Sequence, residues 1–176
     1  MAKSCSFEAT IVAVDYAAPL DQLVLGLKFG AQLDLAALMA RLLAEAARAL
    51  PAFPRPALLV PVPLGRQRLI QRGFNQALEI ARPLGRALDI PVTSRLVTRV
   101  RETGAQSLLH PDARRRNVAG AFAVLPGASA ALYGRHIGVV DDVMTTGETL
   151  DALASTLCAG GAASVTNFVF ARTLPN

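Results

Sequence analysis

One segment, residues 137–150, constrains the fold of this chain more than any other. It reads IGVVDDVMTTGETL. Its four apolar residues are typical of a buried strand in a parallel sheet, two adjacent acids follow, and a run of small and hydroxyl-bearing residues then opens a helix. Because ligands of open α/β sheets bind beyond the carboxyl ends of the strands, we expect this loop to lie at a binding edge.

The residue types in this loop suit a phosphorylated sugar. Backbone N–H groups at a helix N-terminus bind phosphate, Gly147 allows close approach of the backbone, and the threonine hydroxyls add donors. The carboxylates of Asp141 and Asp142 can hold vicinal hydroxyls, either directly or through a hydrated Mg²⁺. The alternative interpretation is structural: the acids cap a helix and the threonines fill a turn.

The rest of the chain alternates strands with helices, which predicts an α/β fold with a mostly parallel central sheet flanked by helices. We expect strands at 7–16, 57–62, 96–100, 120–125, 136–141 and 164–171. We expect helices at 19–29, 34–50 (with Asp34 as N-cap), 75–88 and 147–159, and loops at 65–75 and 101–117, the latter with a short helix as the alternative. Three prolines at 51, 54 and 56 mark a boundary between a front segment, 1–57, and a core, 58–176.

The charge is unevenly spread along the chain. Residues 59–116 carry eleven basic and four acidic side chains, whereas residues 117–176 carry two basic and four acidic ones. Arginine forks bind phosphate in a bidentate manner, so the basic block predicts an anionic partner, with a solvated arginine face as the alternative. Only Phe74 and Phe122 are aromatic near this block, so no base-stacking platform is evident from the sequence.

Several classes of protein are excluded by composition. Two cysteines, Cys5 and Cys158, can form neither a disulfide framework nor a four-cysteine zinc site. No signal peptide opens the chain, and the two long uncharged stretches, 117–134 and 152–171, contain the turn residues of core elements and not of membrane spans. We therefore expect a cytoplasmic protein without a membrane span.

The 137–150 segment resembles the phosphoribosyl pyrophosphate (PRPP) motif of type I phosphoribosyltransferases. Two further segments narrow the resemblance: VPVPLGRQRLIQRGFNQ at 60–76, and the spaced residues of 99–122. With Tyr16 and the LKF run at 27–29, these are similar to the ComF family of competence-associated, phosphoribosyltransferase-like proteins, and the resemblance covers about residues 16–172. It implies the type I phosphoribosyltransferase fold, with residues 1–57 as a small N-terminal hood.

The resemblance implies a role for each matched residue. It implies that Asp141 and Asp142 bind the ribose hydroxyls, together with a Mg²⁺ that is held mostly through PRPP and water. It gives the 5′-phosphate loop to Val143, Met144, Thr145, Thr146, Gly147, Glu148 and Thr149. It gives the pyrophosphate loop to Pro63, Leu64, Gly65, Arg66, Arg68 and Arg72. It gives a mobile loop that closes over the site to Arg99, Arg101, Thr103, Gln106, Arg114 and Asn117.

Three points depart from the family or stay open. Family members commonly carry an N-terminal four-cysteine zinc ribbon, but only Cys5 is available here, so no zinc is expected. Purine enzymes of the hypoxanthine–guanine type carry an acid where this chain has Thr145, which speaks against that kind of transfer. Glu148, placed in the catalytic group with the two aspartates, is either an acid–base group or a partner of the helix dipole, and its position at the helix start favours the latter.

Two functions follow as hypotheses. The first is Mg²⁺-dependent transfer of phosphoribosyl from PRPP to an unidentified base or other acceptor, linked by the family to DNA uptake. The second is a non-catalytic protein that binds nucleotide or single-stranded DNA in natural transformation. The resemblance leaves open a homodimer and contacts with other competence proteins.

Overall fold

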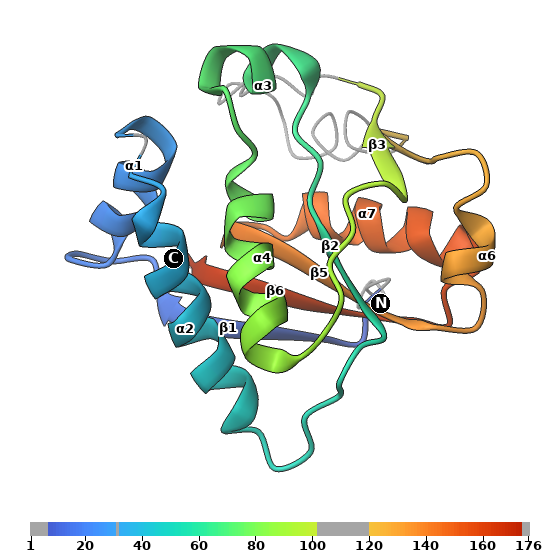
Figure 1. Cartoon of the computed structure of the whole chain (residues 1–176), viewed down its shortest axis with the longest axis horizontal. Coiled ribbons are helices and arrows are strands. Elements are labelled where there is room, and N and C mark those ends of the chain that lie inside the picture. The colour runs from blue at the N-terminus through green and yellow to red at the C-terminus, as the bar shows by residue number, and fades with distance from the viewer. Residues whose placement is uncertain (1–6, 31, 102–119, 174–176) are drawn as a thin grey trace.

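The computed structural model describes residues 7–30, 32–101 and 120–173. The first half contains β1 (Ala9–Asp15), α1 (Asp21–Phe29), α2 (Asp34–Arg48), β2 (Leu58–Pro61), α3 (Arg66–Arg72) and α4 (Gln76–Leu88). The second half contains β3 (Val97–Arg99), β4 (Phe122–Val124), α6 (Ser129–Leu132), β5 (His136–Met144), α7 (Glu148–Ala159) and β6 (Ser164–Arg172). Figure 1 shows these elements on the chain.

The central sheet has four strands in the order β1-β6-β5-β2, and every neighbouring pair is parallel. A separate antiparallel pair, β3 and β4, stands beside it. This confirms the predicted α/β class with a parallel central sheet. The carboxyl ends of β5, β6 and β2 meet at one edge, which is where binding sites of such sheets lie.

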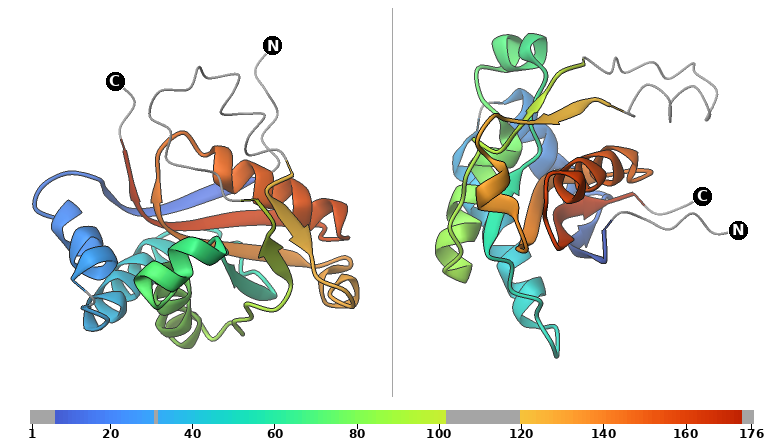
Figure 2. Two further views of the ribbon diagram at one scale, coloured as in Figure 1. Left: turned by 90° about the horizontal axis from the view of Figure 1, so that it is seen from above. Right: turned by 90° about the vertical axis from the view of Figure 1, so that its right-hand side faces the viewer.

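Helices cover both faces of the sheet, as the two views of Figure 2 show. On one face α1, α2 and α4 enclose an apolar cluster that includes Leu27, Leu43 and Phe168. On the other face α7 and the β3–β4 pair enclose a second cluster that includes Leu153 and Val165. Burial on both faces explains why β5 and β6 read as continuous apolar runs.

The start of α4 is fixed by its capping residue. The Asn75 side chain accepts hydrogen bonds from the N–H groups of Ala77 (2.9 Å) and Leu78 (3.4 Å), which satisfies two donors that a helix start leaves unpaired. The predicted N-cap of α2 is wrong, because Leu33 holds that position and Asp34 is the first helical residue. There its charge still interacts favourably with the helix dipole.

Three other elements differ from the sequence predictions. The predicted loop at 65–75 contains α3, a helix without a buried residue that ends at Gly73 in the left-handed region (φ 81°). Its Arg, Gln and Leu residues favour helix but show no apolar periodicity, so the sequence pattern concealed it. The short helix α6 was not predicted, and β5 continues beyond Asp141 to Met144.

The front segment contributes to the same sheet as the rest of the chain. β1 pairs with β6 along Ala9–Asp15, and α2 packs its buried face into the cluster that also holds residues of α4 and β6. The boundary at residue 57 stays a prediction. No helix within the described ranges is long and apolar enough to cross a membrane.

Candidate functional site

The two aspartates lie in the last part of β5, at the carboxyl edge of the sheet. The strand ends at the buried Met144, after which Thr145 and Thr146 are exposed. Gly147 then adopts the left-handed region (φ 81°) and serves as the N-cap of α7. The expected order of acids, hydroxyl-bearing loop and helix start is therefore present, with the loop open to solvent.

The loop that follows β2 begins beside these residues. The N–H of Val62 donates to the carbonyl of Val140 on β5 (2.9 Å), one residue before Asp141. Pro63 and Leu64 are half-buried, Gly65 is buried, and Arg66 is exposed at the first position of α3. The predicted pyrophosphate loop and the predicted 5′-phosphate loop thus extend from neighbouring strands.

Asp142 is almost completely buried, with 3 % of its surface exposed, and it is paired with a residue that the sequence did not single out. Lys28 on α1 places its Nζ atom 2.6 Å from Asp142 Oδ2. Gln76 on α4 donates to Asp142 Oδ1 at the long distance of 3.5 Å. The LKF run at 27–29, which carried part of the family resemblance, was the signal that could have pointed to Lys28.

Asp142 Oδ2 has this ionic contact but accepts no hydrogen bond of good geometry from the residues that the structure describes. A carboxylate oxygen has more than one lone pair, so Asp142 Oδ2 can accept a ligand hydroxyl in addition to its contact with Lys28. The described ranges hold no group of three acidic, histidine or cysteine side chains that could bind a metal by themselves. Two adjacent carboxylates nevertheless fit Mg²⁺, because this ion commonly takes one or two carboxylates and completes its shell with phosphate and water.

Asp141 has an unusual protonation equilibrium. Although the residue as a whole is only half-buried, its carboxyl group is surrounded by protein, and this burial raises its pKa well above the ordinary range of an aspartate. The charge of Asp142 raises the pKa further, while the N–H of Asp142, which donates to Asp141 Oδ1 (2.9 Å), and the charge of Lys28 oppose the shift. Without a bound cation, the site therefore favours a protonated Asp141.

Replacing Asp141 by asparagine, which mimics the protonated acid, should raise the thermal unfolding midpoint of the ligand-free protein at pH 7. An aspartate in the unfolded chain ionises near pH 4, whereas the raised pKa keeps folded Asp141 protonated to higher pH. The stability contributed by this group is therefore full below about pH 4 and is lost as pH rises through the folded pKa. Thermal unfolding followed from pH 4 to pH 8 measures this.

The matched control is Asp15→Asn, at the exposed end of β1. For Asp141→Asn the gain over the parent protein should shrink as the pH falls toward 4, while the control should show no such trend. A constant difference between Asp141→Asn and the parent protein across this range would contradict the raised pKa.

Gln76 connects Asp142 to the arginines of α3. Arg72 Nη1 donates to Gln76 Oε1 (2.6 Å), and the same amide donates from Nε2 to Asp142. Asn75 caps α4 and donates from Nδ2 to the carbonyl of Val62 (3.0 Å), which fixes the end of β2. The RGFNQ segment therefore couples the basic helix to the carboxylates and to the loop after β2.

Burial lowers the pKa of Arg72, and the charge of Arg68 adds to this effect while Asp142 opposes it.

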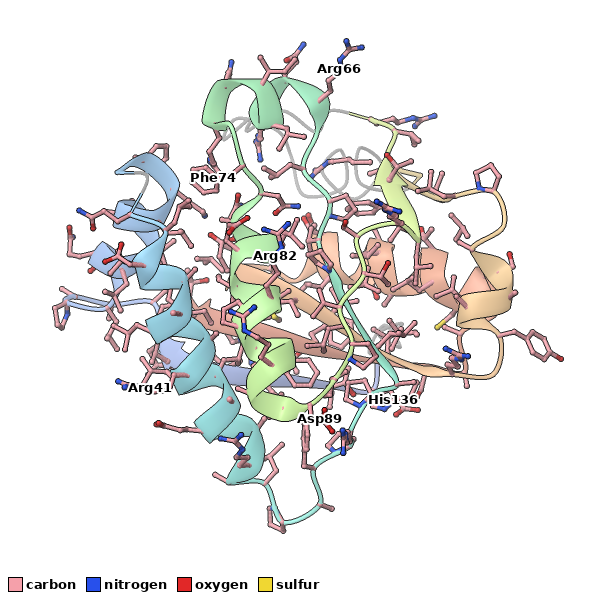
Figure 3. All side chains as sticks on the ribbon, in the orientation of Figure 1. Arg41, Arg66, Phe74, Arg82, Asp89 and His136 are labelled. Carbon is pink, nitrogen blue, oxygen red and sulfur yellow. The ribbon has the colours of Figure 1, made fainter. Side chains whose placement is uncertain are left out.

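A cavity of about 610 Å³ lies between α1 and α3. Its lining includes Lys28, Arg68, Arg72, Tyr16, Phe29 and Phe74. Figure 3 shows Phe74 on the side of α3 that faces α1, with Arg66 away from it at the far end of the helix. Two of the predicted pyrophosphate ligands, Arg68 and Arg72, thus face a cavity to which the front segment contributes aromatic side chains.

The structure describes only the base of the predicted mobile loop. Arg99 ends β3 and stacks over the ring of Phe122 (5.4 Å), and its Nε atom donates to the carbonyl of Arg101 (3.3 Å). The N–H of Val100 donates to the carbonyl of Ala121 (2.8 Å), which joins the chain segments on either side of the loop. The other predicted residues of this loop, Thr103, Gln106, Arg114 and Asn117, lie outside the described residues.

Curated relatives match almost the whole chain, although no protein-family model matches it. DNA utilization protein YhgH of Escherichia coli K12 is 38 % identical over 172 residues, which cover 96 % of this chain and 74 % of the relative. The YhgH protein of Salmonella typhi is 40 % identical over 164 residues, covering 91 % and 70 %. Competence protein F of Haemophilus influenzae is 35 % identical over 155 residues, covering 86 % and 67 %.

Similar solved structures are more distant. The glutamine PRPP amidotransferase of Bacillus subtilis is 16 % identical with a TM-score of 0.48, and the match covers 75 % of this chain but only 25 % of the amidotransferase. The purine phosphoribosyltransferase of Pyrococcus horikoshii is 20 % identical with a TM-score of 0.41, covering 80 % and 73 %.

Proposed function

The chain belongs to the family of DNA utilization protein YhgH and competence protein F, and from this premise we propose that it binds PRPP at the carboxyl edge of its sheet and transfers the phosphoribosyl group. The observation that carries the proposal is the meeting of three parts at one edge. These parts are the aspartate pair at the end of β5, the open threonine loop at the start of α7, and the loop that follows β2.

The proposed roles follow from the position of each group. The N–H groups and hydroxyls of the loop from Thr145 to Thr149 hold the 5′-phosphate, supported by the helix dipole of α7. The aspartates take the ribose hydroxyls, and Asp142 Oδ2 accepts one of them beside its ionic contact with Lys28. Glu148 begins α7 and complements its dipole.

In the proposed reaction the bond between ribose C1′ and pyrophosphate breaks, pyrophosphate leaves, and the acceptor forms its bond to C1′. The loop from Pro63 to Arg66 holds pyrophosphate through backbone N–H groups and the Arg66 guanidinium. Mg²⁺, held by the aspartates and PRPP, would neutralise charge on the departing pyrophosphate. The chain itself positions the reactants, stabilises the developing charge and excludes water when the loop based at Arg99 closes.

Calorimetric titration of PRPP in the presence of Mg²⁺ tests this proposal. Thr145→Val combined with Thr146→Val should weaken binding at least tenfold, because each hydrogen bond to a charged group contributes on the order of 1.5–3 kcal/mol. Both side chains are exposed, so the fold should persist. Thr93→Val, near the amino end of β2 where Thr93 N–H donates to Leu59, is the matched control and should bind like the parent protein.

Two outcomes separate the parts of the proposal. No PRPP binding by the parent protein would overturn it entirely. Binding without release of pyrophosphate in the presence of candidate acceptors would refute catalysis and favour the non-catalytic hypothesis. The cytoplasmic location and the link to DNA uptake are part of this proposal, the latter resting on the relatives' names.

A further inference from the structure

The cavity between α1 and α3 brings together aromatic side chains that are distant in the sequence. Tyr16 follows β1, Phe29 ends α1, and Phe74 precedes α4, yet all three line the same space. Phe29 is 76 % exposed, so its ring is accessible to a ligand at the mouth of this cavity. The structure thus supplies the aromatic platform that the sequence alone did not reveal.

The same cavity carries a surplus of positive charge. Lys28, Arg68 and Arg72 line it, and none of its described lining residues is acidic. The ion pair with Asp142 neutralises the charge of Lys28, so the two arginines leave the cavity with a net charge of about +2. A phosphomonoester carries a charge of about −1.5 to −2 at neutral pH, which matches this surplus.

The arginines and the aromatic rings already interact in the absence of a ligand. The guanidinium of Arg72 lies 5.7 Å from the centroid of the Phe29 ring, in the range of a cation–π contact. Arg72 is also held by Gln76, so its position relative to the cavity is fixed. A flat ring and an attached anion can therefore be bound by neighbouring groups that are held in place beforehand.

We propose that this cavity is a nucleotide-binding site, in which the base stacks on Phe29 and Phe74 and the phosphate is bound by Arg68 and Arg72. The cavity volume of about 610 Å³ lies within the range of small-molecule sites, about 300–1,000 Å³. No residue of the threonine loop of α7 lines this cavity, so nucleotide binding there does not require that loop. The same chemistry is offered by a free nucleotide and by a nucleotide unit of single-stranded DNA.

The test compares a ligand that has both a base and a phosphate with ligands that have only one of them. Thymidine 5′-monophosphate should bind the parent protein at least tenfold more tightly than thymidine or inorganic phosphate, as measured by calorimetry without PRPP. Phe29→Ala should weaken its binding about tenfold, because stacking of one base on an aromatic side chain contributes about 1–3 kcal/mol. Arg68→Gln should weaken it by a similar factor.

Controls come from residues of the same type elsewhere. Tyr133→Ala removes a ring that is 81 % exposed beyond α6, and Arg41→Gln removes an exposed arginine of α2; both should bind like the parent protein. Absence of mononucleotide binding, or unchanged affinity in both Phe29→Ala and Arg68→Gln, would overturn the proposal. The Thr145→Val, Thr146→Val variant should keep nucleotide binding, which separates failure of this site from failure of the PRPP site.

A short thymidine oligonucleotide distinguishes the two sources of the ligand. Tighter binding of the oligonucleotide than of the mononucleotide, with a steep decrease in affinity as salt rises, would identify single-stranded DNA as the source. Equal or weaker binding would identify the free nucleotide. In both cases Phe29→Ala should reduce the affinity for the tighter ligand.

Discussion

Lys28→Met is expected to lower the free energy of unfolding by about 3 kcal/mol, because it leaves Asp142 charged and buried without a cation. Removing one partner of a buried ion pair typically costs about 3–5 kcal/mol, and the partial exposure of the Lys28 side chain (22 %) places the loss near the lower figure. Methionine keeps most of the apolar stem, so the change is mainly one of charge. For a chain of this size the thermal midpoint should fall by roughly 6–12 °C.

Two further variants show whether the ion pair is the cause. Lys28→Met combined with Asp142→Asn should recover most of the loss, because asparagine carries no charge and can still accept from Gln76. Arg41→Met removes the ion pair between Arg41 and Glu45, in which the two side chains are 69 % and 62 % exposed. This substitution should change the free energy of unfolding by less than about 0.5 kcal/mol. Urea unfolding measures all three, and a loss for Lys28→Met as small as that for Arg41→Met would contradict the argument.

The position of Lys28 also explains why the front segment matters to the site. Its helix, α1, has only nine residues, too few to be stable by itself, and it is held by the burial of Val24 and Leu27 and by the contact with Asp142. The carboxylate that we assign to ribose binding is thus part of the packing of α1. Loss of the pair should therefore affect both the site and the stability of α1.

Much of the fold was predictable because its signals are local. The strand at 136–141 was predicted from an apolar run and the helix at 147–159 from the small and hydroxyl-bearing residues that open it, and β5 and α7 confirm them. The helix α3 was missed because none of its residues is buried, so it has no apolar stripe for a periodicity to reveal. The continuation of β5 through Asp142 was missed because acids at a strand end resemble the start of a loop.

The site was less predictable because its contacts cross the sequence. Adjacent residues such as Asp141 and Asp142 were singled out together, and they do lie at the carboxyl edge. The pairing of Asp142 with Lys28 depends on how α1 folds over the end of β5, and no spacing in the sequence encodes it. The same holds for Phe29, which joins Phe74 only because α1 and α3 line the same cavity.

Gly147→Val is expected to abolish PRPP binding while leaving most of the protein folded. At φ 81° a residue with a side chain costs about 1–2 kcal/mol, and a β-branched residue tolerates this region least. A Cβ atom at this position would also lie 3.0 Å from Cε of Met144, the residue that ends β5. The backbone should therefore leave the left-handed region and turn the N–H groups of the loop away from the phosphate. Calorimetric titration with PRPP and Mg²⁺, together with thermal unfolding, measures both effects.

Gly134→Val is the control that separates loss of PRPP binding at the threonine loop from the general cost of placing valine at a positive φ. Gly134 also has a positive φ (66°), but a Cβ atom there meets nothing within 4 Å, and it precedes β5 at the opposite end from the threonine loop. Both variants should lose stability, because a β-branched residue is unfavourable at the positive φ of either position. Only Gly147→Val should lose PRPP binding. If both variants bind PRPP equally well, the 5′-phosphate is not held by the N–H groups that Gly147 positions.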